Sequence, residues 1–145
     1  MNNFEIDNEM NNLDCYLGTF ARDDIPNILI KKRPLGLIIN TDPSNKPGTH
    51  WVALFINQNN CAEYFDSFGE RPICCEIQNF LKINKIKCLK YNKYKIQSIF
   101  SSNCGAFCIL YLKTRCNKFS FNEFIKLFTA NKIYNDAIVE RIIEN

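Results

Sequence analysis

Residues 50–69, HWVALFINQNNCAEYFDSFG, predict the centre of the fold. Two runs of β-favouring residues, Trp51–Asn57 and Cys61–Asp66, flank a short polar segment with the composition of a hairpin turn. The pattern therefore predicts two antiparallel strands. Because antiparallel pairing brings the start of one strand to the end of its partner, we expect His50 and Asp66 to be neighbours.

The segments around this hairpin indicate an α+β domain. Leu35–Asn40 is an apolar run of strand length, and Lys87–Ile96 is strand-like and basic. Pro72–Asn84 has helical spacing, and Cys104–Cys116 predicts a buried helix that is apolar on nearly all sides. The length of 145 residues fits one domain, residues 1–145, with its own hydrophobic core.

Four side chains in this framework are those that a cysteine hydrolase needs. Cys104 begins the buried helix, where unpaired N–H groups and the helix dipole favour a thiolate. His50, the single histidine of the chain, would be the general base, with Asp66 orienting its ring. Gln97 would donate to an oxyanion beside the backbone N–H of Cys104. Each residue alone also fits an ordinary structural role, and their order along the chain favours catalysis.

Taken in order, these residues resemble the motifs of the adenovirus-type (adenain-like) cysteine proteases, which share a clan with the ubiquitin-like-protein proteases. The matching motifs are His50-Trp51, Tyr64-Phe65-Asp66-Ser67-Phe68-Gly69, Gln97 and Cys104-Gly105-Ala106-Phe107-Cys108, with Asp14–Phe20 and Ile38–Thr41 upstream. The resemblance implies a papain-like, adenain-like α+β fold with a central mixed β-sheet and the catalytic cysteine at the N-terminus of a buried helix. By position it assigns Cys104 as nucleophile, His50 as base, Asp66 as orienting acid and Gln97 as oxyanion donor. Adenovirus enzymes usually have Glu where this chain has Asp66, whereas the ubiquitin-like-protein proteases have Asp.

The resemblance implies a viral endopeptidase that processes precursor and capsid proteins during virion maturation, in the virion and the infected host cell. It implies that no metal or other cofactor is required, and that a viral peptide and DNA are candidate activators. Cys88 lies where the family links its activating peptide by a disulfide, although an unconnected thiol is the alternative reading of Cys88. We expect a monomer.

Two other functions remain open at this stage. A protease that removes a ubiquitin-like modifier would use the same four residues, so only substrates separate it from a maturation protease. A decayed protease kept as a DNA-binding or capsid-binding module would bind DNA without an activated thiol.

A basic stripe runs from Lys82, near the end of the predicted helix at 72–84, to Lys95. It contains six lysines, no acidic residue and two interleaved tyrosines; the lysines are Lys82, Lys85, Lys87, Lys90, Lys93 and Lys95. Such a stripe can neutralise nucleic-acid phosphates. The alternative is a solvated face that keeps the protein soluble, and the net charge of +3 does not decide between them.

The cysteine pattern favours free thiols over a disulfide framework. The chain has eight cysteines and a sufficient apolar content, and its first residues do not resemble a secretory signal peptide. We therefore expect a reducing compartment, cytoplasm or nucleus, and no secretion. Adjacent Cys74-Cys75 and the isolated pair Cys104 and Cys108 do not have zinc-site spacing. No apolar run approaches the roughly 18 residues of a membrane span, so no membrane partner is expected.

Overall fold

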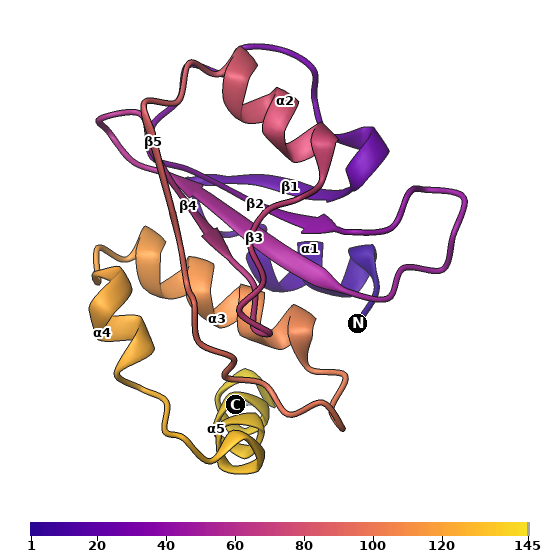
Figure 1. Cartoon of the computed structure of the whole chain (residues 1–145), viewed down its shortest axis with the longest axis vertical. Helices are drawn as coiled ribbons and strands as arrows, with labels where there is room; N and C mark the ends of the chain where they lie inside the picture. The colour runs from indigo at the N-terminus through magenta and orange to yellow at the C-terminus, as the bar shows by residue number, and fades with distance from the viewer. Residues whose placement is uncertain (145) are drawn as a thin grey trace.

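The computed structural model describes residues 1–144, in which a five-stranded mixed sheet has helices on both faces (Figure 1). The strands lie in the order β1–β2–β3–β4–β5, with the bounds Tyr16–Ala21, Leu35–Asn40, Trp51–Ile56, Cys61–Phe65 and Cys88–Tyr91. The central pairs β2–β3 and β3–β4 are antiparallel, while the outer pairs β1–β2 and β4–β5 are parallel. The predicted α+β class, mixed sheet and antiparallel hairpin are confirmed.

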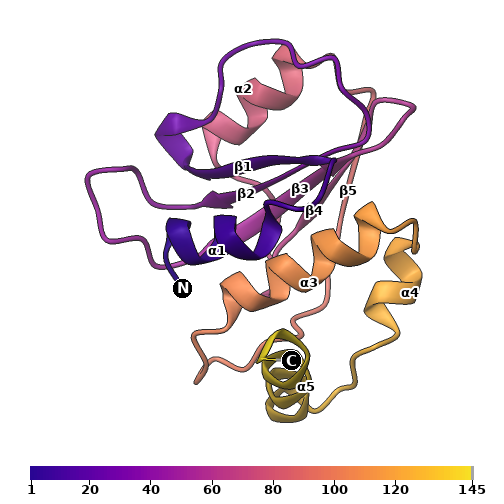
Figure 2. The ribbon, with the colours of Figure 1, turned by 180° about the vertical axis from the view of Figure 1, so that it is seen from behind.

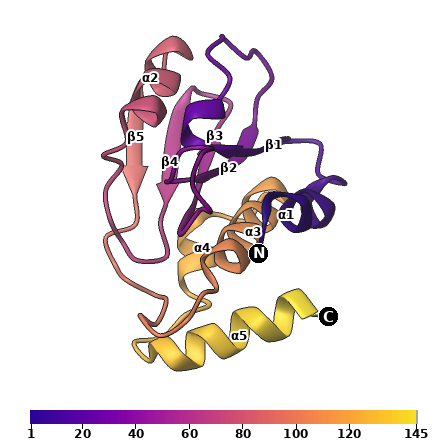
Figure 3. The same ribbon diagram turned by 90° about the vertical axis from the view of Figure 1, so that its right-hand side faces the viewer.

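The helices divide between the two faces of the sheet (Figures 2 and 3). Helix α3, Cys104–Cys116, lies along one face beside α1, Asn3–Met10, and the same side carries α4, Phe121–Ile125, and α5, Lys132–Glu144. Helix α2, Cys75–Ile83, covers the opposite face with a short 3-10 helix at 22–24. The sheet is therefore the middle layer of the molecule.

The two apolar layers explain why the central strands are continuous apolar runs. Every residue of β2 and β3 is buried, because alternate side chains point to opposite faces and both faces are covered. Phe55 and Phe65 pack toward α3, while Leu54 and Tyr64 pack toward α2. Nine consecutive residues of α3, Cys104–Leu112, are buried, as its all-round apolar pattern predicts.

Two predicted elements are shorter than expected. The basic strand expected over 87–96 forms only at Cys88–Tyr91, because the side chain of Asn92 turns inward and bonds the backbone of Asp66. The helix expected from Pro72 begins at Cys75, and Ile73 is 77% exposed instead of packing on the core. Strand β1 was not predicted from the sequence, because all its residues are half-buried and do not alternate between buried and exposed positions.

The expectation that every cysteine is a free thiol is wrong for four of the eight. Cys15 bonds Cys116, which joins the start of β1 to the end of α3 across 101 residues of sequence. Cys61 bonds Cys88, its register partner across β4 and β5. Cys88 is thus not the free thiol that a disulfide to an activating peptide requires, and that assignment is corrected. The remaining cysteines, Cys74, Cys75, Cys104 and Cys108, are free.

Candidate active site

His50 and Asp66 meet at the edge of the sheet where β3 begins and β4 ends, as the hairpin register predicts. The Nε2 atom of His50 lies 2.7 Å from Oδ1 of Asp66, which is almost completely buried. The same oxygen accepts the backbone N–H of Phe68 at 2.8 Å. The ring of Phe68 also packs on the imidazole, with 5.0 Å between ring centroids. These contacts fix which ring nitrogen of His50 faces the acid.

Asn92 holds the backbone of Asp66 in place, a role that the sequence did not indicate. Its Oδ1 accepts the N–H of Asp66 at 3.0 Å, and its Nδ2 donates to the carbonyl of Asp66 at 2.5 Å. Gly69 completes the turn with positive φ, donating to the same carbonyl at 2.8 Å. Asn92 is a buried residue in an otherwise mostly exposed basic segment. Composition does not show which residue of such a segment is buried, so the sequence contained no signal for this role.

Cys104 occupies the first position of α3. Phe107 is the first residue whose N–H bonds back along the helix, to the carbonyl of Asn103 at 3.0 Å. The N–H groups of Cys104, Gly105 and Ala106 precede that ladder, so they are available near the sulfur. Asn103 does not cap the helix with its side chain, because its Nδ2 bonds Asp136 and Glu140 on α5.

The electrostatics of the pair favour a thiolate and an imidazolium. Burial lowers the pKa of His50, but its hydrogen bond to Asp66 and the nearby sulfur of Cys104 outweigh burial and raise that pKa to about 9. Burial raises the pKa of Cys104, but His50 and the backbone at Trp51 and Gly105 reverse this and lower it overall. The two shifts are coupled, since each charged group stabilises the other.

The second ring nitrogen of His50 completes the arrangement. Nδ1 is buried and has no hydrogen-bond partner within residues 1–144. Because Nε2 is bonded to Asp66, Nδ1 is the nitrogen that can exchange a proton with Cys104. The arrangement is therefore able to carry out nucleophilic thiol chemistry with one histidine as proton carrier.

Gln97 lies fully buried in the loop between β5 and α3, and its side chain contacts Ser67 and Ser101. Its Oε1 accepts a hydrogen bond from the hydroxyl of Ser67, the residue after Asp66. Its Nε2 donates to Ser101, at 3.1 Å from the carbonyl oxygen and 2.9 Å from Oγ. The structure thus brings Gln97 to the site through Ser67, with an amide already engaged on one side.

A cavity of about 760 Å³ borders the acid on the α2 side of the sheet. It is lined by Arg22, Thr41, Tyr64, Asp66, Glu70, Arg71, Ile73, Cys74, Cys75 and Glu76.

The six lysines of the basic stripe are all exposed, and Lys95 lies over the ring of Phe68 at 5.2 Å from its centroid. One end of the stripe therefore reaches the loop that contacts His50.

Neither a metal cluster nor a membrane span is found in the part of the chain that the structure describes. No group of three or more His, Cys, Asp or Glu side chains there is arranged to hold a metal ion. Within those same residues, no helix has both the length and the apolar character that crossing a membrane requires.

Comparison with known proteins gives matches to viral cysteine proteases. Residues 16–135 match the family model described as adenovirus endoprotease. A cysteine protease of African swine fever virus is 34% identical over 108 residues, which are 65% of this chain and 39% of that protein. A relative from another isolate of that virus, named a SUMO-1 cysteine protease, is 33% identical over 108 residues, again 65% and 39% of the two chains. The match thus spans about two fifths of the length of these relatives.

A solved structure shares the fold. The crystal structure of the African swine fever virus protease superposes with a TM-score of 0.64 at 20% identity, covering 86% of this chain and 60% of that one.

Proposed function

Because this chain belongs to the adenovirus endoprotease family, we propose that it is a viral cysteine endopeptidase of the adenain type. The observation that carries the proposal is the pairing of His50 Nε2 with Asp66 at 2.7 Å, which leaves Nδ1 for the thiol of Cys104. Cys104 is the nucleophile, His50 the general base and acid, and Asp66 the orienting carboxylate. Gln97 and the backbone N–H of Cys104 are the oxyanion donors.

The proposed reaction has two steps that share one proton carrier. The thiolate of Cys104 attacks the peptide carbonyl carbon, and the proton on Nδ1 of His50 goes to the departing amine as the C–N bond breaks. Water then attacks the thioester carbonyl and gives a proton back to Nδ1. The C–S bond breaks, which releases the acid and restores the thiolate–imidazolium pair. Asp66 keeps its bond to Nε2 throughout, so it fixes the tautomer and the ring orientation.

The substrates and setting of this activity are part of the proposal. We propose that viral precursor and capsid proteins are cleaved during virion maturation, in the virion and infected host cell, by a monomer that uses no metal. DNA is a candidate activator that would bind the exposed lysine stripe, and its effect would weaken steeply with added salt. An activating peptide that is linked through Cys88 would first have to open the Cys61–Cys88 bond.

Thiol labelling tests the proposal directly. Iodoacetamide is added at neutral pH, the modified cysteine is mapped by mass spectrometry, and His50→Ala is treated in parallel. We expect Cys104 to react faster than the exposed free thiol of Cys75, and to lose that advantage in the His50 variant. Equal slow labelling of both thiols, with and without added DNA, would contradict an activated pair.

Removal of a ubiquitin-like modifier is the second candidate, and one observation favours it. The relative of 33% identity is named a SUMO-1 cysteine protease. The catalytic residues are the same for both functions, so only substrates separate them. The two substrates to compare are a modifier that carries a fluorogenic C-terminal amide and a precursor-derived peptide. A higher kcat/KM for the modifier than for the peptide would identify removal of a ubiquitin-like modifier, and not virion maturation, as the function.

A further inference from the structure

Two consecutive buried side chains of α5 hold the backbone on both sides of Gln97. Asn135 donates from Nδ2 to the carbonyl of Ile96 at 3.0 Å. Asp136 accepts the N–H of Ser98 on Oδ2 at 2.9 Å. Asn135 and Asp136 are both almost fully buried, so these bonds form away from bulk water, where they are strongest. The helix therefore fixes the backbone on either side of the proposed oxyanion donor.

The carboxylate of Asp136 also reaches the side chain of Gln97 through one intermediate. Oδ1 of Asp136 accepts the hydroxyl of Ser101 at 2.5 Å, across 35 residues of sequence. Since that hydroxyl has given its one hydrogen to Asp136, its oxygen is left to accept from Gln97 Nε2 at 2.9 Å. Oδ1 also accepts from Asn103, the residue before the nucleophile, at 3.1 Å. The contacts form a chain from Asp136 through Ser101 to the amide of Gln97.

This chain determines which way the amide of Gln97 points. The carbonyl oxygen of Ser101 can only accept, so the atom that faces it must be the amide nitrogen. At the other end, the hydroxyl of Ser67 bonds Oε1. Nε2 has two acceptors within bonding distance, the carbonyl oxygen and Oγ of Ser101. The amide of Gln97 is therefore held by Ser101 at its nitrogen and by Ser67 at its oxygen.

We infer that Asp136 is a positioning residue, which holds Ser101 and the Ser98 backbone so that the side-chain amide of Gln97 keeps the orientation from which Nε2 donates to the oxyanion. This inference rests on the proposed function, in which Gln97 is the oxyanion donor. Asp136 touches neither the substrate nor the reacting atoms, and acts only through the orientation of Gln97. A donor that is held in place before reaction stabilises the transition state without reorganisation at the moment of reaction.

Asp136→Asn tests the inference, because it keeps the size of the side chain and removes one of the two acceptor oxygens. We expect kcat for peptide hydrolysis to fall about 10- to 100-fold with little change in KM, which is less than the roughly 10² to 10³ of a lost oxyanion donor. Iodoacetamide alkylation of Cys104 forms no oxyanion, so its rate and pH profile should stay unchanged. Ser101→Ala should behave like Asp136→Asn, and Ser101→Thr, which keeps the hydroxyl, should restore activity.

A double-mutant cycle separates positioning from general destabilisation. In a Gln97→Ala background, Asp136→Asn should change kcat by less than about threefold, since contacts that act through one group do not add. Glu140→Gln is the matched control, because Glu140 lies one turn later on α5 and accepts from Asn103 at 2.7 Å without a link to Gln97. We expect Glu140→Gln to leave kcat unchanged.

An NMR measurement keeps the inference testable even if the protein hydrolyses no peptide. Wild-type Gln97 should give two separate, slowly exchanging side-chain N–H signals, and Asp136→Asn should bring them toward the values of a free amide. Unchanged signals in Asp136→Asn would overturn the inference whatever the activity of the protein. It would also be overturned by parallel losses of hydrolysis and of Cys104 alkylation, or by an undiminished effect in the Gln97→Ala background. Slow, unselective alkylation of wild-type Cys104 would instead count against the proposed function.

Discussion

Replacing Asp66 by Asn is the most direct perturbation of the His50–Cys104 pair. Asn has the same shape and keeps an oxygen that can accept from the N–H of Phe68, so the local turn should persist. The backbone bonds from Asn92 to position 66 are also independent of the side chain. The substitution removes the negative charge beside Nε2 of His50, which in the wild-type protein lies 2.7 Å from a carboxylate oxygen of Asp66.

The size of the effect follows from the pKa of His50. With Asp66 present that pKa is about 9, so about 97% of His50 is protonated at pH 7.5 by ordinary acid–base arithmetic. Without the carboxylate, only Cys104 is left to oppose burial, which is the largest single effect on this pKa. We therefore expect the pKa to return toward its ordinary value of about 6.5, at which protonation at pH 7.5 is about 10%. The imidazolium that stabilises the Cys104 thiolate thus becomes about tenfold scarcer.

Two assays separate the two roles of Asp66. Alkylation of Cys104 depends on the thiolate alone, so its rate at pH 7.5 should fall about tenfold, in line with the change in protonation of His50. Peptide hydrolysis also needs the correct tautomer and ring orientation, so kcat/KM should fall by about 10² to 10⁴. Asp23→Asn is the control, because Asp23 carries an exposed carboxylate in the 3-10 helix at 22–24 and bonds Ser44. Rates within about twofold of wild type at unchanged Tm would refute the reasoning, since they would leave Asp66 without electrostatic influence on the pair.

Three further expectations concern pH and stability. The kcat/KM for hydrolysis should rise with pH as Cys104, whose pKa is lowered, loses its proton, and should fall as His50 loses its proton near its pKa of about 9. A pH profile of kcat/KM without a descending alkaline limb would contradict the pairing. Because the folded pKa of His50 is raised, its contribution to stability is full below pH about 6.5 and is lost as the pH rises through about 9, which denaturant titrations at several pH values would detect. Arg115→Ala should destabilise the fold by about 3 to 5 kcal/mol, because the carboxylate of buried Glu63 loses the guanidinium that bonds it at 2.7 and 2.9 Å and keeps only the hydroxyl of Tyr111. Thermal unfolding should show a clear drop in Tm for this variant and almost none for Lys113→Ala, which breaks an exposed ion pair.

The parts of the site that the sequence predicted correctly are those that depend on local structure. His50 and Asp66 are 16 residues apart and belong to one hairpin, so strand pattern and turn composition were enough to bring them together. The buried helix that begins at Cys104 was predicted with its observed bounds, because nine consecutive buried residues leave a clear apolar run. Neither prediction required knowledge of how distant segments pack.

Contacts between distant segments explain what the sequence did not predict. Strand β1 is half-buried at every position and pairs in parallel with β2, so it lacks the alternation that marks a strand at the edge of a core. Cys15 and Cys116 are 101 residues apart, and their bond depends on β1 and the end of α3 lying together. Counting cysteines cannot provide that information, because connectivity is a property of the folded chain.

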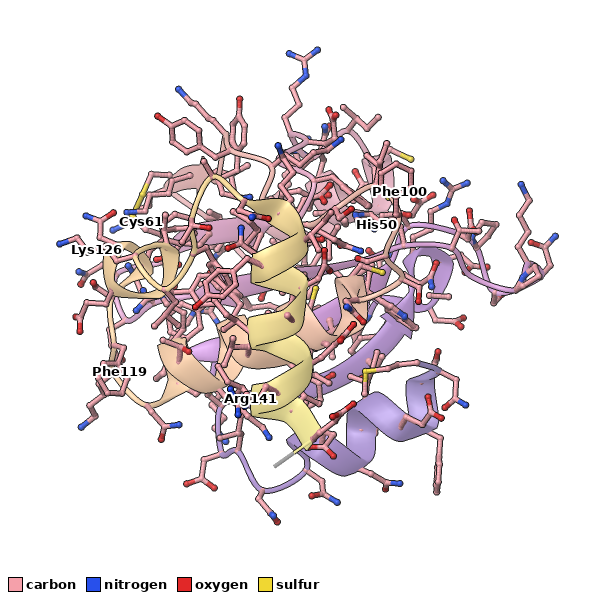
Figure 4. The ribbon with its side chains drawn as sticks, turned by 90° about the horizontal axis from the view of Figure 1, so that it is seen from below. His50, Cys61, Phe100, Phe119, Lys126 and Arg141 are labelled. Atoms are coloured by element: carbon pink, nitrogen blue, oxygen red, sulfur yellow. A yellow bond between two sulfur atoms is a disulfide. The ribbon has the colours of Figure 1, made fainter. Side chains whose placement is uncertain are left out.

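The same reasoning changes how the C-terminal segment is interpreted. No residue after Cys116 was predicted from the sequence to belong to the site. Seen from below, α5 crosses the front of the molecule, and His50 and Phe100 lie to one side of its N-terminal end (Figure 4). Its Asp136 bonds the loop that joins Gln97 to Cys104, through Ser98 and Ser101. Hydrophobic periodicity cannot reveal this role, because a buried polar side chain interrupts the apolar pattern instead of extending it. If Asp136 orients Gln97 as inferred, docking of α5 and assembly of the oxyanion site are one event, and a variant that loosens α5 should lose turnover while its thiol remains reactive.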